Sequence, residues 1–299
     1  MVEDELITEA GSDPHAGYES RATSELVALM NAEDSSVPEA VLAATASISE
    51  TIDAIAERMR AGGRLVYVGA GSSGLIAALD ASECEGTFST PPGLVVALVA
   101  GGAGAAPLAR AAAEDDRHAG ARDVGALDIG AEDAVVGISA SGSTPYVAGA
   151  LETAAAAGAL TACVVCAPGS VLGGLADQEI VVVVGPEFIA GSTRLKAGTA
   201  QKLVLNTIST VSMIRLGKTY GNLMVDVAAA NEKLVERVRR IVAAATGATS
   251  QEIDEALVAA GGDARVAIVS LAANVDADTA RARLDASGRS IARALEEAQ

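Results

Sequence analysis

The chain of 299 residues has no tryptophan and few other aromatic residues, with two phenylalanines and four tyrosines. Half of it is nevertheless hydrophobic, so alanine, valine, leucine and isoleucine must build the core. The length suits one large domain together with a smaller one. The longest apolar runs are strand-length and fall short of the roughly 20 residues of a membrane span. No membrane is therefore expected as a partner.

Cysteine and histidine are scarce as well, which argues against several kinds of site. Three cysteines give no disulfide framework and indicate a reducing compartment. Cys163 and Cys166 are three residues apart in a predicted strand, so they point to opposite faces and cannot share a metal ion. Neither His15 nor His118 has a convincing nucleophile partner, so a Ser-His-Asp site is not expected. These residues predict no metal site.

Positive charge is also in short supply, because 39 acidic residues outnumber 21 basic ones and give a formal net charge of −18. Such a surface repels nucleic acid and anionic membranes, so neither is expected to bind. An anionic substrate needs a local basic pocket against that field. The acidic start of the chain, residues 1–5, is not a signal pattern. Together with the few cysteines, it predicts a cytoplasmic protein.

Short runs that are apolar throughout alternate with helical stretches along much of the chain. Apolar residues at every position indicate strands buried on both faces, and the alternation predicts an α/β fold with a doubly wound parallel sheet of five strands. Ligands of such sheets bind at the carboxyl ends of the strands. The predicted strands are Arg64–Val68, Leu94–Val99, Ala134–Ile138, Leu160–Val165 and Ile180–Val184.

The composition divides the chain into three predicted parts. Residues 1–24 are acidic and polar and are expected to form a loosely structured arm, residues 25–239 hold the α/β domain, and residues 240–299 form a small helical C-terminal cap. Helical periodicity over residues 25–61 is interrupted just before Pro38, which suits the first turn of a second helix.

Two loops rich in glycine and serine follow strands of the predicted sheet. Gly69–Gly74 opens a helix, where glycines let the backbone approach a phosphate and the helix N-terminus stabilises its charge. The same spacing suits a dinucleotide, but the next strand ends in Ala100–Gly102 and offers no acid for a ribose. Ser139–Thr144 is a second such loop, although a simple helix N-cap explains it equally well when it is taken alone. Together the loops predict a site for a phosphosugar, with contacts from Gly71, Ser72, Ser73, Ser139, Ser141, Ser143 and Thr144.

A third segment, residues 191–206, joins hydroxyl groups and cations to a helical pattern. Small hydroxylated residues in its first half accompany the cations Arg194, Lys196 and Lys202. A basic segment that opens a helix suits an anion, because free N–H groups and the positive end of the dipole face it. Ser192, Lys196 and Lys202 are therefore part of the predicted substrate site.

Two glutamates are candidates for acid–base chemistry. Glu83 and Glu114 lie in segments that flank the Leu94–Val99 run, an arrangement that lets both face one pocket. Two carboxyl groups divide the roles of general acid and general base when their environments separate their pKa values. Among 39 acidic residues, however, a single one is more often an ordinary surface charge.

These segments together resemble the N-acetylmuramic acid 6-phosphate etherases, a family whose fold is the sugar isomerase (SIS) domain. The resemblance runs from about residue 26 to residue 299. It rests on Leu29–Asp34, Gly69–Gly74, Leu79–Cys84, Ala100–Gly102, Glu114–Asp115, Ser141–Tyr146, Gly185–Glu187, Gly191–Asn206 and Gly221–Asp226.

The resemblance implies a specific activity for this chain. Family members are carbon–oxygen lyases that cleave the D-lactyl ether of N-acetylmuramic acid 6-phosphate and release N-acetylglucosamine 6-phosphate and D-lactate. They need no cofactor and no metal, and they form homodimers. The family's proposed acid corresponds to Glu83, and its second glutamate corresponds to Glu114.

The chain departs from the family pattern in one consistent respect. Family members usually carry arginine where this chain has Leu75 and Ser143, and residues 8–14 lack the arginine of the family's N-terminal pattern. Arginine binds phosphate or carboxylate bidentately, which leucine and serine cannot do. Two alternatives therefore stay open: a related lyase, hydratase or isomerase acting on another phosphorylated sugar, and a non-catalytic phosphosugar sensor.

Overall fold

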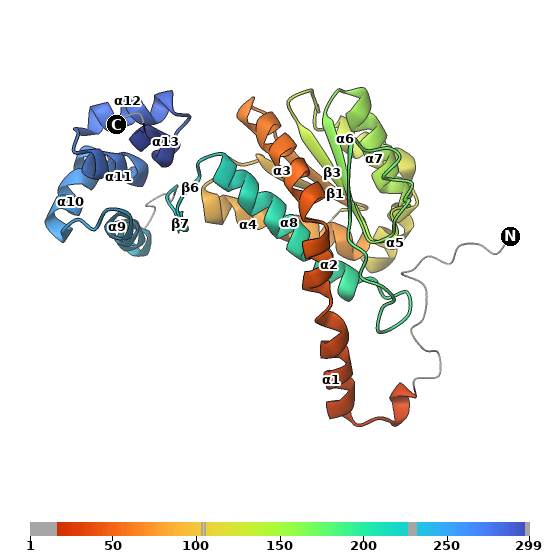
Figure 1. Cartoon of the computed structure of the whole chain (residues 1–299). Coiled ribbons are helices and arrows are strands. Elements are labelled where there is room, and N and C mark those ends of the chain that lie inside the picture. The colour runs from red at the N-terminus through yellow and green to blue at the C-terminus, as the bar shows by residue number, and fades with distance from the viewer. Residues whose placement is uncertain (1–16, 103, 105, 227–231, 297–299) are drawn as a thin grey trace. The chain divides into compact units, whose positions relative to one another are not determined.

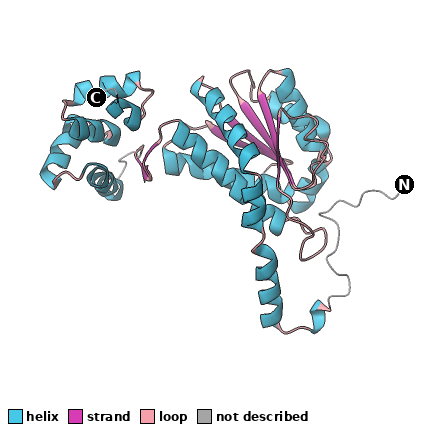
Figure 2. Cartoon of the chain, viewed as in Figure 1, coloured by secondary structure: helices cyan, strands magenta, loops and turns pink. Residues whose placement is uncertain are grey.

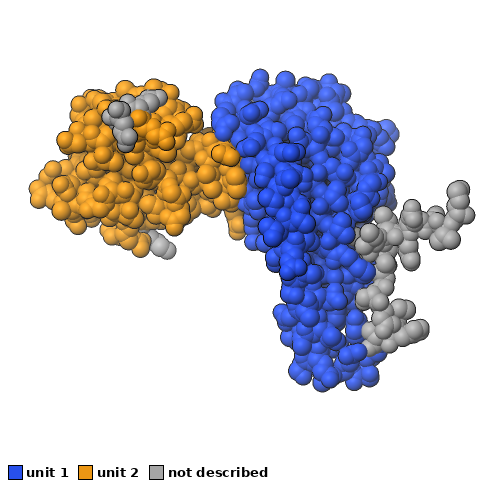
Figure 3. Space-filling view, in the orientation of Figure 1, with its two compact units in different colours: residues 1–82, 93–209 blue, residues 83–92, 210–299 orange. Residues whose placement is uncertain are grey.

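The computed structural model of the chain describes residues 17–102, 104, 106–226 and 232–296. The chain divides into two compact units, which Figure 3 colours separately. Unit 1 comprises residues 1–82 and 93–209, and unit 2 comprises residues 83–92 and 210–299. Most of the predicted N-terminal arm lies outside the described residues, and the predicted boundary after residue 239 stays a prediction.

Unit 1 is built on a parallel sheet, which Figure 2 shows in magenta. Its five strands lie in the order β2-β1-β3-β4-β5. The predicted five-stranded parallel sheet is therefore confirmed. β5 differs most from its prediction, because it ends at Val181 and the apolar residues 182–184 lie beyond it. The strands are β1 (Leu65–Gly69), β2 (Val95–Val99), β3 (Ala134–Ser139), β4 (Leu160–Val165) and β5 (Gln178–Val181).

The three central strands are enclosed by helices on both sides. β1, β3 and β4 are buried along their whole length, which explains why their sequences are apolar without alternation. Helices α3 (Thr45–Arg60) and α7 (Pro145–Ala156) pack on opposite sides of the sheet (Figure 1). On its side, α7 contributes Tyr146, Val147 and Leu151 to the hydrophobic core.

The N-terminal helices of unit 1 are shorter than the sequence suggested. The predicted helical segment 25–61 has a second break at Ala44, in addition to the one before Pro38. α1 projects from the rest of unit 1 in Figure 1 and buries none of its residues. After a single turn at Tyr18–Ser20, the further helices of unit 1 are α1 (Thr23–Asp34), α2 (Val37–Ala43), α5 (Pro107–Glu114) and α6 (Arg117–Gly125).

Two long helices are shared between the units. α4 (Gly71–Phe88) begins in unit 1 and ends in unit 2, and α8 (Lys196–Arg215) does the same. Within unit 1 the two helices are joined by a buried carboxylate. Asp80 Oδ1 accepts hydrogen bonds from Asn206 Nδ2 at 2.6 Å and from Ser209 Oγ at 3.0 Å.

The strand order creates a topological switch point between β1 and β3. The chain leaves β1 for β2 on one side and then returns to β3 on the other, so the connections after β1 and β3 run in opposite directions. Gly69 at the end of β1 pairs with Ile138 of β3, which brings the two following loops together. Open α/β sheets bind ligands in the crevice that such a point leaves.

Unit 2 contains a two-stranded hairpin followed by helices, and the predicted C-terminal helices are confirmed. Its central helix, α11, is buried over Ala264–Val269 and contacts the four helices around it. In the described part of the chain no single helix is long and apolar enough to cross a membrane, and α10 and α11 meet those criteria only as a pair bent by 120°. The elements are β6 (Thr219–Tyr220), β7 (Leu223–Met224), α9 (Glu232–Thr246), α10 (Ser250–Ala259), α11 (Ala264–Ala273), α12 (Ala277–Ala286) and α13 (Ile291–Glu296).

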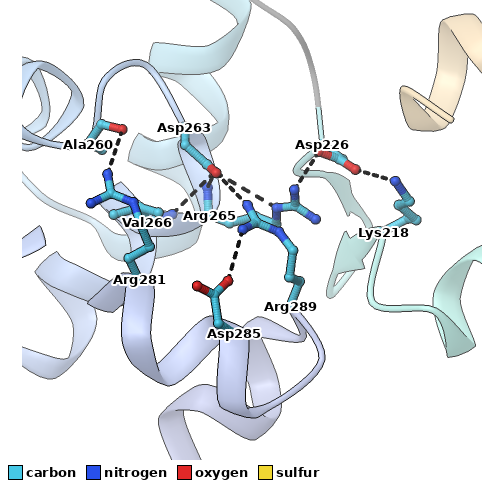
Figure 4. Close-up of polar contacts among 9 residues, drawn as sticks. All are labelled: Lys218, Asp226, Ala260, Asp263, Arg265, Val266, Arg281, Asp285 and Arg289. Carbon is cyan, nitrogen blue, oxygen red and sulfur yellow. Dashed lines mark hydrogen bonds and ion pairs between the residues drawn. The ribbon is translucent and has the colours of Figure 1, made fainter. Parts of the chain in front are cut away.

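A network of ion pairs joins the parts of unit 2, as Figure 4 shows. Asp226, after the hairpin, pairs with Lys218 at 2.5 Å and with Arg265 of α11 at 2.9 Å. Asp263 caps the first turn of α11 and pairs with Arg289 at 2.5 Å. Burial lowers the pKa of Arg265, and the Asp226 carboxylate opposes that shift. The charges of this network are thus compensated within unit 2.

Candidate active site

A cavity of about 200 Å³ lies at the switch point of unit 1. The loop after β1, the loop after β3, the end of α5 and the segment before α8 all contribute to its wall. Most of its polar side chains carry hydroxyl groups, and one carries a carboxyl group. The lining residues are Ala70, Gly71, Ser72, Ser73, Glu114, Ile138, Ser139, Ala140, Ser141, Thr144 and Thr193.

The first loop connects β1 to α4 in a turn too tight for a side chain at Gly74. A Cβ atom at Gly74 would lie 2.6 Å from the carbonyl oxygen of Gly69, so only glycine allows this approach. The N–H group of Gly74 donates to the carbonyl of Ala70, and the amides before it precede the first helical hydrogen bond. The start of α4 therefore presents N–H groups to the cavity beside the hydroxyls of Ser72 and Ser73, an arrangement that binds anions.

The second loop is held by its own hydroxyl groups. Ser139 Oγ accepts from the Gly142 amide at 3.0 Å and lies 2.8 Å from Thr144 Oγ1. Ser141 Oγ accepts from the Ser143 hydroxyl at 3.1 Å. Gly142 has φ +71°, and a Cβ atom there would lie 2.3 Å from the Cβ of Ser170. Ser139 and Thr144 are buried, whereas Ser141 is half-buried and more open to a ligand.

Glu114, the last residue of α5, brings a carboxyl group into this cavity. A Cβ atom built on Gly71 would lie 4.0 Å from Glu114 Oε2, so the carboxyl group approaches the first loop. Burial raises the pKa of Glu114, Asp115 adds to the rise, and a hydrogen bond with Thr144 opposes it. Apart from Glu114, the lining residues that the structure describes are uncharged. A carboxyl group in a cavity with its pKa raised is suited to proton transfer.

Lys196 lies outside the lining of this cavity. Its buried side chain pairs with Glu33 of α1 at 2.6 Å. The amides of Lys196 and Ala197, which open α8, donate to the buried carboxylate of Glu187 at 2.9 and 3.0 Å. Two amides at the start of this helix, where the sequence predicted an anion site, are therefore already hydrogen-bonded within the chain. No local sequence pattern indicated that Glu33 would pair with the Lys196 side chain or that Glu187 would accept from the amides of α8.

Three other predicted residues are also absent from the lining. Ser143 is exposed and contacts the cavity residue Ser141. Lys202 is exposed on α8, and Ser192 is half-buried. Its neighbour Thr193, which was not among the predicted site residues, does line the cavity. The hydroxyl-rich pattern of residues 191–194 was the sequence signal from which Thr193 could have been predicted as a site residue.

The structure brings only one of the two candidate glutamates into the cavity. Glu83 is exposed on α4 and belongs to the 83–92 segment of unit 2, whereas Glu114 belongs to unit 1. The cavity lining includes Glu114 and not Glu83. An acid–base pair of Glu83 and Glu114 therefore stays a prediction.

The cysteines take no part in this site. Cys163 and Cys166 are free and buried, and burial raises the pKa of each thiol to about 12. Such thiols are protonated and unreactive at neutral pH. In the described ranges, no three His, Cys, Asp or Glu side chains are grouped so as to hold a metal ion.

Known proteins share the fold and the loops that form this cavity. The family model described as the glucokinase regulatory protein N-terminal SIS domain matches residues 47–155, which include both serine loops. A solved phosphoheptose isomerase from Francisella tularensis matches with a TM-score of 0.50 and 21% identity, covering 64% of this chain and 100% of that one. At that identity the likeness concerns the fold alone. By fold, the chain is an SIS-domain protein.

Two curated relatives identify the particular family. The N-acetylmuramic acid 6-phosphate etherase of Rubrobacter xylanophilus is 56% identical, over 94% of this chain and 94% of the relative. That of Streptomyces avermitilis is 52% identical, over 97% of this chain and 93% of the relative. The chain belongs to the N-acetylmuramic acid 6-phosphate etherase family, and the family resemblance of its sequence is confirmed.

Proposed function

We propose that the protein is a carbon–oxygen lyase that cleaves the D-lactyl ether of N-acetylmuramic acid 6-phosphate. The products are N-acetylglucosamine 6-phosphate and D-lactate. Family membership over nearly the whole chain supports this proposal. The single structural observation that carries it is one cavity that combines the start of α4 with the carboxyl group of Glu114. An anion-binding helix start and a proton-transfer group are the two parts that such a reaction requires.

The serine loops are the proposed phosphate site. Ser72 and Ser73 on the first loop and Ser141 on the second offer hydroxyl donors, and the amides at the start of α4 add further donors. α7 also begins at this cavity, so the positive ends of two helix dipoles favour an anion there. These groups substitute for a cationic side chain, which matters in a chain with a net charge of −18.

Glu114 is the proposed general base. In the reaction, the sugar opens to its aldehyde and the proton on the neighbouring carbon becomes acidic. The Glu114 carboxylate removes that proton, and the resulting electron pair expels the ether oxygen of the lactyl group from the next carbon. Glu83 is the proposed acid that protonates the departing oxygen. Water then adds to the unsaturated aldehyde at the carbon that lost the lactyl group. The raised pKa of Glu114 makes its carboxylate a stronger base than that of an ordinary glutamate.

The working form is proposed to be a homodimer in the cytoplasm that needs no cofactor. α1 supports the dimer, because a helix of 12 residues that buries none of them is marginally stable on its own. Val27 on this helix is 55% exposed, which leaves an apolar side chain available to a second copy. Sedimentation at micromolar concentration measures the assembly. A fully active monomer would contradict the dimer.

Incubation of the purified protein with N-acetylmuramic acid 6-phosphate tests the proposed reaction. We expect D-lactate and N-acetylglucosamine 6-phosphate in equal amounts. In deuterated water the sugar product should carry deuterium on the carbon next to the aldehyde. Glu114→Gln is the matched control that lacks the base. Tight binding of the phosphosugar by wild type without release of D-lactate would contradict the lyase and favour the alternatives that the missing arginines leave open.

A further inference from the structure

The loop that precedes α8 is closed at its base by one buried carboxylate. Glu187 is fully buried, and its two carboxylate oxygens accept hydrogen bonds from the amides of Lys196 and Ala197 at 2.9 and 3.0 Å. Residues 188–195 therefore form a loop whose two ends are fixed to each other. We call it the site loop, because its residue Thr193 lines the candidate active-site cavity.

The position of Thr193 is coupled to the start of α8. The Thr193 carbonyl oxygen accepts from the Gly198 amide at 2.9 Å, and the Thr193 amide donates to the Gly191 carbonyl at 3.0 Å. Gly198 lies in the first turn of α8, two residues after Lys196. A displacement of this first turn therefore also displaces Thr193, and with it one part of the cavity wall.

The N-terminal segment of unit 1, residues 18–34, is joined to the site loop at two points. The Tyr18 ring stacks on the Phe188 ring, with the centroids 4.6 Å apart and the planes inclined by 6°. Near the end of α1, Glu33 Oε2 accepts from Lys196 Nζ at 2.6 Å. Phe188 is the first residue of the site loop, and Lys196 directly follows its last residue. The two contacts therefore hold the loop at both of its ends.

The ion pair of Glu33 and Lys196 is the more demanding of these contacts. The Lys196 side chain is only 4% exposed, whereas the Glu33 side chain is 42% exposed. A buried ammonium group requires a partner for its charge, so Glu33 restricts where the first residue of α8 can lie. A second cavity, of about 420 Å³, is lined by Tyr18, Glu33 and Phe188 among others. The segment and the loop are thus joined across a hollow and not by a packed core.

We propose that Glu33 and Lys196 are positioning residues that hold Thr193 at the substrate cavity, with the ring stack of Tyr18 and Phe188 as a weaker second contact. The Lys196 ammonium thereby acts on the substrate through the first turn of α8, not by touching it. Thr193 offers its hydroxyl to the phosphosugar. This inference rests on the proposed function, because it takes the phosphosugar as the substrate of the cavity.

Glu33→Gln, which keeps the shape of the side chain and removes its charge, tests the proposal. Without substrate, the amides of Thr193, Lys196 and Gly198 should exchange their hydrogens about tenfold faster, because the loop opens locally more often. KM for the phosphosugar should rise about tenfold, the scale of one hydrogen bond. The value of kcat should change little, because the contact is lost from ground state and transition state alike. Glu39→Gln, an exposed glutamate on α2, is the matched control.

Further variants make the result specific to these contacts. Lys196→Met breaks the same ion pair, so its combination with Glu33→Gln should raise KM no more than the larger single change. Tyr18→Leu should raise KM about threefold, which is within the range for loss of one aromatic stack. Tyr18→Phe keeps the ring and should leave KM at the wild-type value.

Unchanged amide exchange or an unchanged KM in Glu33→Gln would overturn the proposal, even if the melting temperature fell, because the ion pair would then serve folding alone. Fully multiplied effects in the double variant would also overturn it. If Lys196→Met does not fold, Tyr18→Leu and Tyr18→Phe still test the proposal, because equal KM values would contradict it.

A substrate-free measurement separates this inference from the proposed reaction. Calorimetry with N-acetylglucosamine 6-phosphate measures binding to the cavity without turnover. A wild type that releases no D-lactate, together with faster loop exchange and weaker binding in Glu33→Gln, would refute the proposed reaction and leave the role of Glu33 and Lys196 standing. Equal binding by wild type and Glu33→Gln would overturn that role.

Discussion

The two ends of the unit 1 sheet surround a carboxyl group in different ways, because Asp133 is buried and Glu114 is half-buried. At the amino ends of the strands, Asp133 lies just before β3 and Arg64 just before β1. The Asp133 carboxylate accepts from the Arg64 amide at 2.8 Å, from the Arg64 guanidinium at 2.8 and 3.1 Å, and from the Gly130 amide at 3.0 Å. At the carboxyl ends, Glu114 lines a cavity whose other described lining residues are uncharged.

The pKa values of the two groups move in opposite directions as a result. Burial disfavours the charge of Asp133, but the hydrogen bonds from Arg64 and Gly130 outweigh it and hold the pKa below its ordinary value. Burial and Asp115 raise the pKa of Glu114, because the opposing effect of the Thr144 hydroxyl is too small to compensate. A carboxylate with all its partners inside the protein is structural, whereas one short of partners is available to a substrate.

Removal of the reactive carboxyl group should have the largest effect and would sharpen this contrast. We expect Glu114→Gln to lower kcat for D-lactate release roughly 10²–10⁴-fold, the scale of one acid–base group. The free energy of unfolding should not fall, because the amide keeps the shape and removes a poorly compensated charge. Steady-state kinetics and urea unfolding measure the two quantities. A variant with near wild-type turnover would remove Glu114 from the reaction.

The open hydroxyl groups at the same end should affect binding more than folding. We expect Ser72→Ala combined with Ser141→Ala to raise KM for the phosphosugar about tenfold or more per lost hydrogen bond to a charged group. The melting temperature should change little, because Ser72 is exposed and Ser141 is half-buried. Ser82→Ala, farther along α4, is the matched control, since its hydroxyl donates to the Leu79 carbonyl. Unchanged phosphosugar binding in the double variant would refute this placement of the phosphate.

At the opposite end, loss of the carboxylate should affect folding and spare chemistry. We expect Asp133→Ala to lower the free energy of unfolding by about 2 kcal/mol, because half-buried donors of Arg64 and Gly130 lose their acceptor. The value stays moderate because the Arg64 side chain is 32% exposed and water replaces part of the loss. Glu132→Ala, an exposed neighbour, is the control for urea unfolding. If Asp133→Ala reduced kcat per folded molecule as strongly as Glu114→Gln, the contrast between the two ends would be broken.

The pH dependence of stability should show the smallest effect, with opposite signs for the two groups. The lowered pKa of Asp133 means that its stabilisation is present at neutral pH and is lost as the pH falls through the folded-state value. The raised pKa of Glu114 means that the folded state binds its proton more tightly, so its ionisation reduces stability as the pH rises past the ordinary value.

Unfolding free energies between about pH 4 and pH 8 provide the measurement. The difference between wild type and Asp133→Asn should shrink toward acid. The advantage of Glu114→Gln over wild type should grow toward neutral pH, because the wild-type carboxyl group is then ionised. Equal pH dependence in both variants would show that the two carboxyl groups do not differ in the proposed way.

Local patterns in the sequence were sufficient for the sheet and for its two serine loops. β1, β3 and β4 are apolar without alternation because both of their faces are buried. This apolar pattern can be read from the residues of each strand alone. Long-range partners left no such pattern. Lys196 was predicted to meet substrate, yet its side chain pairs with Glu33, a residue 163 positions away. That ion pair depends on where α1 lies in unit 1, which neither segment determines by itself.

The sequence by itself determined the five strands, the loops that follow β1 and β3, and membership of the family, because each of these depends on segments of contiguous residues. Tertiary structure alone decided what individual side chains do. Thr144 has the sequence context of a helix cap, but its hydroxyl contacts Ser139 because the turn of the second loop brings that oxygen to 2.8 Å. Glu114 is one acidic residue among 39, and it is distinct because the fold places it half-buried in a cavity beside the first loop, where its pKa is raised.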